Sequence, residues 1–289
     1  DNKSWITTFS GSSVMQVFDA ATDELKFNIP VDTGNWSTFS ISNDSRKAYT
    51  CNYTTGKVSV VDLEAGMVIN SFTVSDSIHG IDINSTNDTL YIGLNVSAGV
   101  MYKVPVNDPN NSQTVYLYGS GTNIFLKPHE IKFRPDYAYY FVTCEGPGDD
   151  EVCVYRADLD LLEKEIEVGN NPSQMAMSAK QGLLFVTCMG DQYFPGITGS
   201  VSVIDMNSFR EIKRIQVGWQ PYALVVDDEA GLVYVANRNF QGTGTMPYYP
   251  SACNGRNGNL SVIDIATLQA KPDIYTEFSV DPFGIAIRY

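Results

Sequence analysis

The stretch LSVID at residues 260–264 decides the fold, because close copies of it recur as VSVVD at 58–62 and VSVID at 201–205. Each copy alternates apolar and polar residues, which is the pattern of a β-strand with one buried face. Two further strands precede it in each repeat, for example PYALVV at 221–226 and LVYVAN at 232–237. A repeat of about 40–50 residues built only from strands predicts a β-propeller with one blade per repeat.

We name the four strands expected in each blade A to D, in chain order. The A strands of the complete repeats lie at 37–41, 79–83, 130–134, 173–178 and 222–226. The N-terminus supplies only B, C and D strands, at 5–9, 14–19 and 25–30. The chain stops just after an A strand at 283–288. Together the two ends complete one blade, so we predict a single all-β domain over residues 1–289, a six-bladed β-propeller closed by its terminal strands. Seven blades are the alternative.

The composition argues against several classes of partner. The net charge is −14 and the pI is about 4.4, and phosphate binding needs clustered Lys and Arg, so we expect no nucleic-acid partner. No run of about 18 apolar residues occurs, so we predict no transmembrane segment. The chain opens at Asp1 rather than at an initiator Met, which indicates a processed or trimmed product.

The strand phrases resemble the YVTN-repeat family of propellers, whose unit reads roughly P-x-G-I-A-V, then L-Y-V-A/T-N, then V-S-V-I-D. The best matches here are 282–287, 233–237 and 260–264. Two units end their B strand in Cys144 and Cys188 instead of the family's Asn, and six blades depart from the seven of most members. The resemblance implies an exported protein, in the periplasm or at a bacterial cell surface.

The predicted topology locates a site. The D–A and B–C connections share one face of a propeller, and the A strands line its central channel. Residues at the start of each A strand are therefore expected to ring the channel mouth; they are Ser37, His79, His129, Ser173, Tyr222 and Phe283. Glu130 and Gln174 follow in the next ring. We predict that this mouth is the working surface.

Both histidines of the chain fall at equivalent positions of adjacent blades, beside Glu130. Imidazole and carboxylate groups suit Zn, Cu or Fe, so His79, His129 and Glu130 are candidate ligands of a transition metal. A transition metal is the one cofactor that the sequence suggests. The alternative is that the three are polar mouth residues facing water.

Two long B–C loops, at 189–200 and 238–259, are expected to open on the same face. Loops of this length are often functional, and Tyr, Trp and Arg are common in binding hot spots. The candidate ligand-binding residues of these loops and of one D–A turn are Tyr193, Arg238, Tyr248, Arg256 and Trp219. The loops bind a small molecule or protein partner on this interpretation; the alternative is a lid or plug.

The cysteines suggest how the longer loop is anchored. Cys188 ends a B strand and Cys253 lies in the long loop of the next blade, so we predict a disulfide between them in an exported protein. Cys144 and Cys153 lie on adjoining strands and form a second candidate pair. Buried, reduced thiols are the alternative, because the distances between Cα atoms decide the matter.

Three functions remain open at this point. We favour a non-catalytic binding scaffold. An enzyme of the lactonase or lyase type is the alternative, since propellers host such activities, and a passive surface-layer repeat is the third hypothesis. The aspartates that end the C strands do not form a carboxylate cluster, because they lie in separate blades, and we interpret them as turn residues. They are Asp19, Asp62, Asp205 and Asp264.

Overall fold

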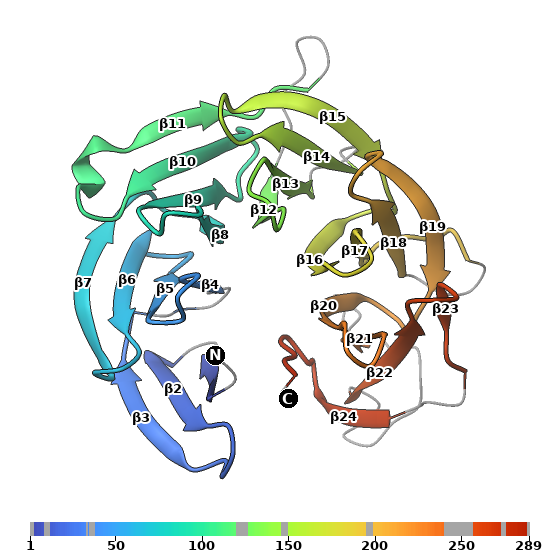
Figure 1. Ribbon diagram of the computed structural model, residues 1–289, viewed down its shortest axis with the longest axis horizontal. Helices are drawn as coiled ribbons and strands as arrows, with labels where there is room; N and C mark the ends of the chain where they lie inside the picture. Colours follow the sequence, from blue (N-terminus) through green and yellow to red (C-terminus); the bar gives the residue numbers. More distant parts are fainter. Residues whose placement is uncertain are drawn as a thin grey trace. The chain divides into compact units, whose positions relative to one another are not determined.

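The computed structural model describes the chain over most of its length. The described residues are 3–8, 12–32, 34, 38–119, 127–145, 150–194, 199–239, 257–272 and 276–287. Their secondary structure is β-strand apart from one short 3-10 turn, η1 (Pro109–Asn111). The strands form six antiparallel sheets, each made from consecutive parts of the chain (Figure 1). The chain is therefore an all-β, six-bladed β-propeller, as predicted.

The strands pair with their neighbours in chain order. The first three sheets contain β1 (Ser4–Thr8), β2 (Val14–Asp19) and β3 (Leu25–Pro30); β4 (Thr38–Ile41), β5 (Lys47–Cys51), β6 (Lys57–Asp62) and β7 (Met67–Thr73); β8 (Ile78–Ile83), β9 (Thr89–Leu94), β10 (Val100–Pro105) and β11 (Gln113–Tyr116). The fourth and fifth contain β12 (Pro128–Phe133), β13 (Tyr139–Cys144), β14 (Glu151–Arg156) and β15 (Leu161–Glu167); β16 (Pro172–Ser178), β17 (Leu183–Cys188), β18 (Ser200–Asp205) and β19 (Arg210–Gln216). The sixth contains β20 (Pro221–Asp227), β21 (Leu232–Asn237), β22 (Asn257–Asp264), β23 (Gln269–Ala270) and β24 (Thr276–Val280).

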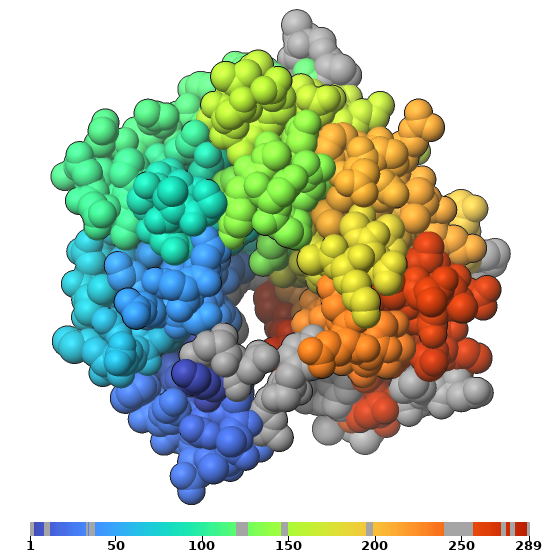
Figure 2. Space-filling model, viewed as in Figure 1, coloured from blue at the N-terminus to red at the C-terminus, as the bar shows by residue number. Residues whose placement is uncertain are grey.

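The chain divides into two compact units, each with its own core. Unit 1 comprises residues 1–142, 155–162 and 288–289, and unit 2 comprises 143–154 and 163–287. In unit 1 the apolar faces of the second and third sheets share a core that includes Tyr49, Val60 and Ile92, and the side chains of neighbouring sheets pack directly together (Figure 2). In unit 2 the fifth and sixth sheets share a core that includes Phe185 and Val235. Alternation along each strand places these residues on one face.

The two ends of the chain depart from the predicted four strands per blade. The first sheet has three strands among the described residues. Residues 282–287 carry no strand, so the pairing expected between 283–288 and the region of β1 stays a prediction. In the sixth sheet the single D strand expected at 274–280 is replaced by β23 and β24, which both pair with β22. Pro272 follows β23, and its missing N–H group cannot continue a ladder.

Candidate functional site

Antiparallel order gives every sheet two different ends. We call the end with the A–B and C–D turns the A–B edge, and the end with the B–C loops and the starts of the A strands the B–C edge. The A–B edge of unit 1 is tied together by its turns. The backbone N–H of Asn43 donates to Asn87 Oδ1 at 2.8 Å, its side-chain amide donates to Asn84 O at 2.9 Å, and the Tyr137 hydroxyl donates to Asn43 Oδ1. Three successive A–B turns thus support one another.

The A–B edge of unit 2 is held in the same way. The Ser178 hydroxyl donates to one carboxylate oxygen of Asp228, and the Lys180 backbone N–H donates to the other at 3.2 Å. Asp228 lies in the A–B turn of the following blade. At this edge of both units, side chains from one turn are therefore used to fix the next.

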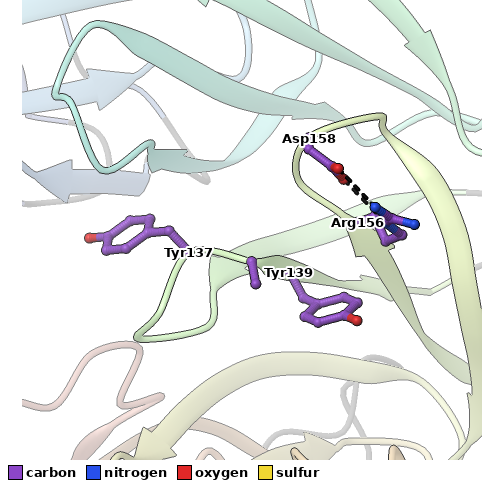
Figure 3. Close-up of a pocket in the computed structure, with 5 residues that line it drawn as sticks. Tyr137, Tyr139, Arg156 and Asp158 are labelled. Carbon is purple, nitrogen blue, oxygen red and sulfur yellow. Dashed lines mark hydrogen bonds and ion pairs between the residues drawn. The ribbon is translucent and has the colours of Figure 1, made fainter.

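One cavity was not anticipated from the sequence, and it lies at the A–B edge of unit 1. It has a volume of about 290 Å³ and is lined by Tyr137, Ala138, Tyr139, Arg156 and Asp158 (Figure 3). The Arg156 guanidinium donates to Asp158 from Nη2 at 2.8 Å and from Nε at 3.2 Å. Because Arg156 and Asp158 bind each other, their charges cancel, and the pair presents no net charge to a ligand in the cavity.

The two histidines meet at the B–C edge of unit 1, as their shared position in the repeat predicts. His79 on β8 and His129 on β12 have ring centroids 4.2 Å apart, inclined by 38°. His79 Nδ1 donates to the His129 carbonyl oxygen at 2.9 Å. A Cβ atom at Gly80 would lie 2.6 Å from the same oxygen, so the two strands approach this closely only because residue 80 is glycine. Both imidazoles are buried, rather than facing water as the alternative expected.

Glu130 does not join the two histidines. Consecutive residues of a strand point to opposite sides, and the Glu130 carboxylate lies 3.5 Å from the ammonium of Lys132, two residues along β12. Burial lowers the pKa of Lys132, but the charges of Glu130 and Asp82 outweigh it and the net shift is upward. Among the described residues no three His, Cys, Asp or Glu side chains are grouped to hold a metal ion. The structure thus assembles the histidine pair without the third predicted ligand.

Unit 2 repeats the ring contact with different residues. Tyr222 at the start of β20 and Phe283 have ring centroids 4.2 Å apart, inclined by 38°. The Arg238 guanidinium lies over both rings, 5.2 Å and 5.1 Å from their centroids, and binds the Asp281 carboxylate through Nε and, at 3.1 Å, through Nη2. Tyr222 and Arg238 were expected to bind a ligand; both are buried, and here they hold residues 281–283 in place.

Tyr193 is the most exposed of the predicted binding residues that the structure describes. Its side chain is 65% exposed, and its ring lies 5.3 Å from the Arg214 guanidinium and 5.0 Å, edge to face, from the Phe194 ring. Asp191 fixes the backbone here, because its carboxylate accepts from the Tyr193 backbone N–H at 3.2 Å. The same carboxylate accepts from the Ser200 hydroxyl at 2.5 Å and lies 3.7 Å from Arg214. Sequence reasoning missed the role of Arg214, because it lies on the outer strand β19 and no local pattern connects it to the loop.

The remaining predicted residues are less informative. Gln174 and Trp219 are half-buried at the B–C edge, and the Gln174 backbone N–H donates to the Thr187 hydroxyl at 3.1 Å. Tyr248 and Arg256 lie outside the described residues.

Cys51, Cys144, Cys153 and Cys188 are buried. No disulfide joins the candidate pair Cys144 and Cys153, so the alternative of buried thiols holds for these two residues. Burial raises the pKa of Cys153 well above its usual range, and a protonated thiol resists oxidation. Burial likewise raises the pKa of Cys188 to about 12. Cys253 lies outside the described residues, and the bridge to Cys188 stays a prediction.

The fold defines the class of protein, a β-propeller, and the comparisons with known proteins extend no further than this class. No protein-family model matches the chain, and no curated protein matches its sequence. Among solved structures the chain is similar to Kuenenia stuttgartiensis hydrazine synthase, with a TM-score of 0.64 and 15% identity over 90% of this chain and 73% of that chain. At this identity the likeness shows the fold alone. In the part of the chain that the structure describes, no helix is long and apolar enough to cross a membrane.

Proposed function

We propose that this chain is an exported propeller of the YVTN-repeat type that binds a small molecule or protein partner at its B–C edge. The family and the export rest on the repeat phrases, such as LSVID at 260–264 and PFGIAI at 282–287. The binding role rests on the difference between the two edges of the sheets.

The observation that carries the proposal is that the Tyr193 ring is exposed to solvent and is also held by neighbouring side chains. The turns of the A–B edge use their side chains to bind one another, whereas Tyr193 at the B–C edge presents most of its ring to solvent. The Arg214 guanidinium and Phe194 support that ring from the protein side. A supported aromatic side chain loses little conformational entropy when a partner covers it, which is the property of a binding hot spot.

Arrays of soluble glycans and of peptides test this proposal. We expect ligands found with the wild type to be lost with Tyr193→Ala, without a change in melting temperature, because an exposed ring contributes little to the core. Tyr116→Ala is the matched control, since Tyr116 is 53% exposed on the outer strand β11. Ligand capture that survives Tyr193→Ala but is lost with Tyr139→Ala would move the binding site to the A–B edge and contradict the proposal.

A further inference from the structure

Asn-x-Ser/Thr triplets are more frequent in this chain than its composition explains. The chain has 21 Asn and 44 Ser or Thr among 289 residues, and random order would give about three such triplets. It has nine, and eight of them begin within residues 1–110. In exported proteins this triplet is the acceptor for N-linked glycosylation when its middle residue is not Pro.

Turn formation accounts for most of the described triplets. Asn52 and Asn259 are only 3% and 4% exposed. Asn43 and Asn84 each donate their side-chain amide to a turn residue, at 2.9 Å and 2.7 Å. Asn87 accepts a backbone hydrogen bond at 2.8 Å. The carboxamides of Asn43, Asn84 and Asn87 hold turns, and those of Asn52 and Asn259 are buried. A glycan on Asn43, Asn84, Asn52 or Asn259 would therefore disturb the fold.

Asn110 differs from these residues. It lies in η1, in the loop between β10 and β11 (Figure 1), where its side chain is exposed and makes no hydrogen bond to any described residue. Ser112, the third residue of the triplet, is also exposed. Its backbone, at φ −69° and ψ 146°, leaves the turn in an extended conformation. Both groups that a glycosyl-transferring enzyme recognises are therefore accessible, and nothing in the described fold requires Asn at position 110.

We propose that Asn110 is an N-glycosylation acceptor, an inference that rests on the export proposed above. The Asn110 Nδ2 atom forms a bond to the anomeric carbon of an oligosaccharide carried on a lipid pyrophosphate. The glycosyl–phosphate bond breaks, the lipid pyrophosphate leaves, and the amide gives up one proton. The loop between β10 and β11 is a C–D connection at the A–B edge of its sheet, so a glycan there leaves the B–C edge of that sheet uncovered.

The test is glycosylation of the purified, folded chain by a single-subunit oligosaccharyltransferase with a lipid-linked oligosaccharide. We expect a mass gain of one oligosaccharide per chain, which peptide mapping assigns to Asn110. Asn110→Gln and Ser112→Ala should each abolish it, because they remove the acceptor amide and the recognised hydroxyl. Asn111→Gln and Ser112→Thr are matched controls in the same turn that keep the triplet and should keep the glycan.

An unmodified wild type, or a mass gain that persists in Asn110→Gln, would overturn the assignment. The melting temperature of each variant confirms that the folded chain is being compared. Because the reaction is carried out on purified protein, its result does not depend on export. Failure of the proposed export would instead appear as retention of the chain in the cytoplasm in a fractionation experiment, with the in vitro modification intact.

Discussion

At the scale of the residue, four aspartates close the C strands in one manner. The side-chain Oδ1 of each accepts backbone N–H groups two or three residues further on: Asp19 from Ala21 and Thr22, Asp62 from Glu64 and Ala65, Asp205 from Asn207 and Ser208, and Asp264 from Thr267. They are turn residues, as their positions at the ends of the C strands predict. Their side chains replace ladder hydrogen bonds that the turning backbone loses.

Asp205→Ala should destabilise the chain by about 1 kcal/mol, because it leaves two N–H groups of the turn without their acceptor. Asp205→Asn keeps a side-chain oxygen at the same place and should cost clearly less. Urea unfolding of both variants measures the difference. Equal losses for the two substitutions would mean that the charge, and not the acceptor, stabilises this turn.

The same carboxylates predict an acid limit to stability. Hydrogen bonds from the backbone lower the pKa of Asp19, Asp205 and Asp264 below the ordinary value of 3.8. A carboxylate with a lowered folded-state pKa contributes stability above its unfolded pKa, and that contribution is lost as the pH falls through the folded pKa. We expect the melting temperature to fall below about pH 4, and to fall less steeply in a triple Asp→Asn variant. Identical acid profiles would contradict this assignment.

At the scale of the element, threonines near the ends of B strands connect one sheet to the next. In unit 2 the Thr143 hydroxyl donates to the Ser173 carbonyl, and the Thr187 hydroxyl donates to the Tyr222 carbonyl, both at 2.8 Å. Both threonines are fully buried. Each links a B strand to the first residues of the following A strand, so the repeat contains its own connector between blades.

Thr187→Val should therefore cost about 1–3 kcal/mol, since it keeps the side-chain shape and leaves a buried carbonyl without its side-chain donor. Thr187→Ser retains the hydroxyl and should recover most of the loss that is due to the hydrogen bond. Denaturant unfolding of both variants measures their free energies of unfolding and so separates the effect of the hydroxyl from that of the side-chain shape. A Val variant as stable as the wild type would show that the hydroxyl makes no net contribution between these sheets.

The strands were largely predictable from the sequence, and the contacts at the site were not. Period-2 alternation and turn residues locate β2 and β3 to the residue, because these signals are local. One exception, the divided D strand of the sixth sheet, has a local cause in Pro272. By contrast, Arg214 with Asp191 and Arg238 with Asp281 pair across distant parts of the chain. No spacing rule links such residues, and only the packing of the sheets brings them together.

At the scale of the whole molecule, a cluster around Arg238 attaches residues 281–283 to the rest of unit 2. The Arg238 side chain is 10% exposed and that of Asp281 36%, and the Arg238 guanidinium also lies over the Tyr222 and Phe283 rings. We expect a double-mutant cycle with Arg238→Gln and Asp281→Asn to give a coupling of about 1–3 kcal/mol, because a two-point hydrogen-bonded pair with a largely buried guanidinium is stronger than a surface pair.

The control for this cycle is the pair of Arg156 and Asp158, whose side chains are 45% and 60% exposed. Its coupling should not exceed about 1 kcal/mol. Limited proteolysis of Asp281→Asn should also cleave residues 281–287 faster than in the wild type. A coupling no larger than that of the control pair would mean that apolar and ring packing, and not the ion pair, attach this segment.

The two ring pairs share one separation, 4.2 Å, and one inclination, 38°, although one pair is His with His and the other is Tyr with Phe. The same contact geometry is therefore compatible with two imidazoles and with two carbocyclic rings. Each of these paired positions therefore accepts more than one kind of aromatic side chain. A protein engineer who installs imidazoles at positions 222 and 283, or aromatic carbocycles at 79 and 129, starts from a contact geometry that the scaffold already accommodates.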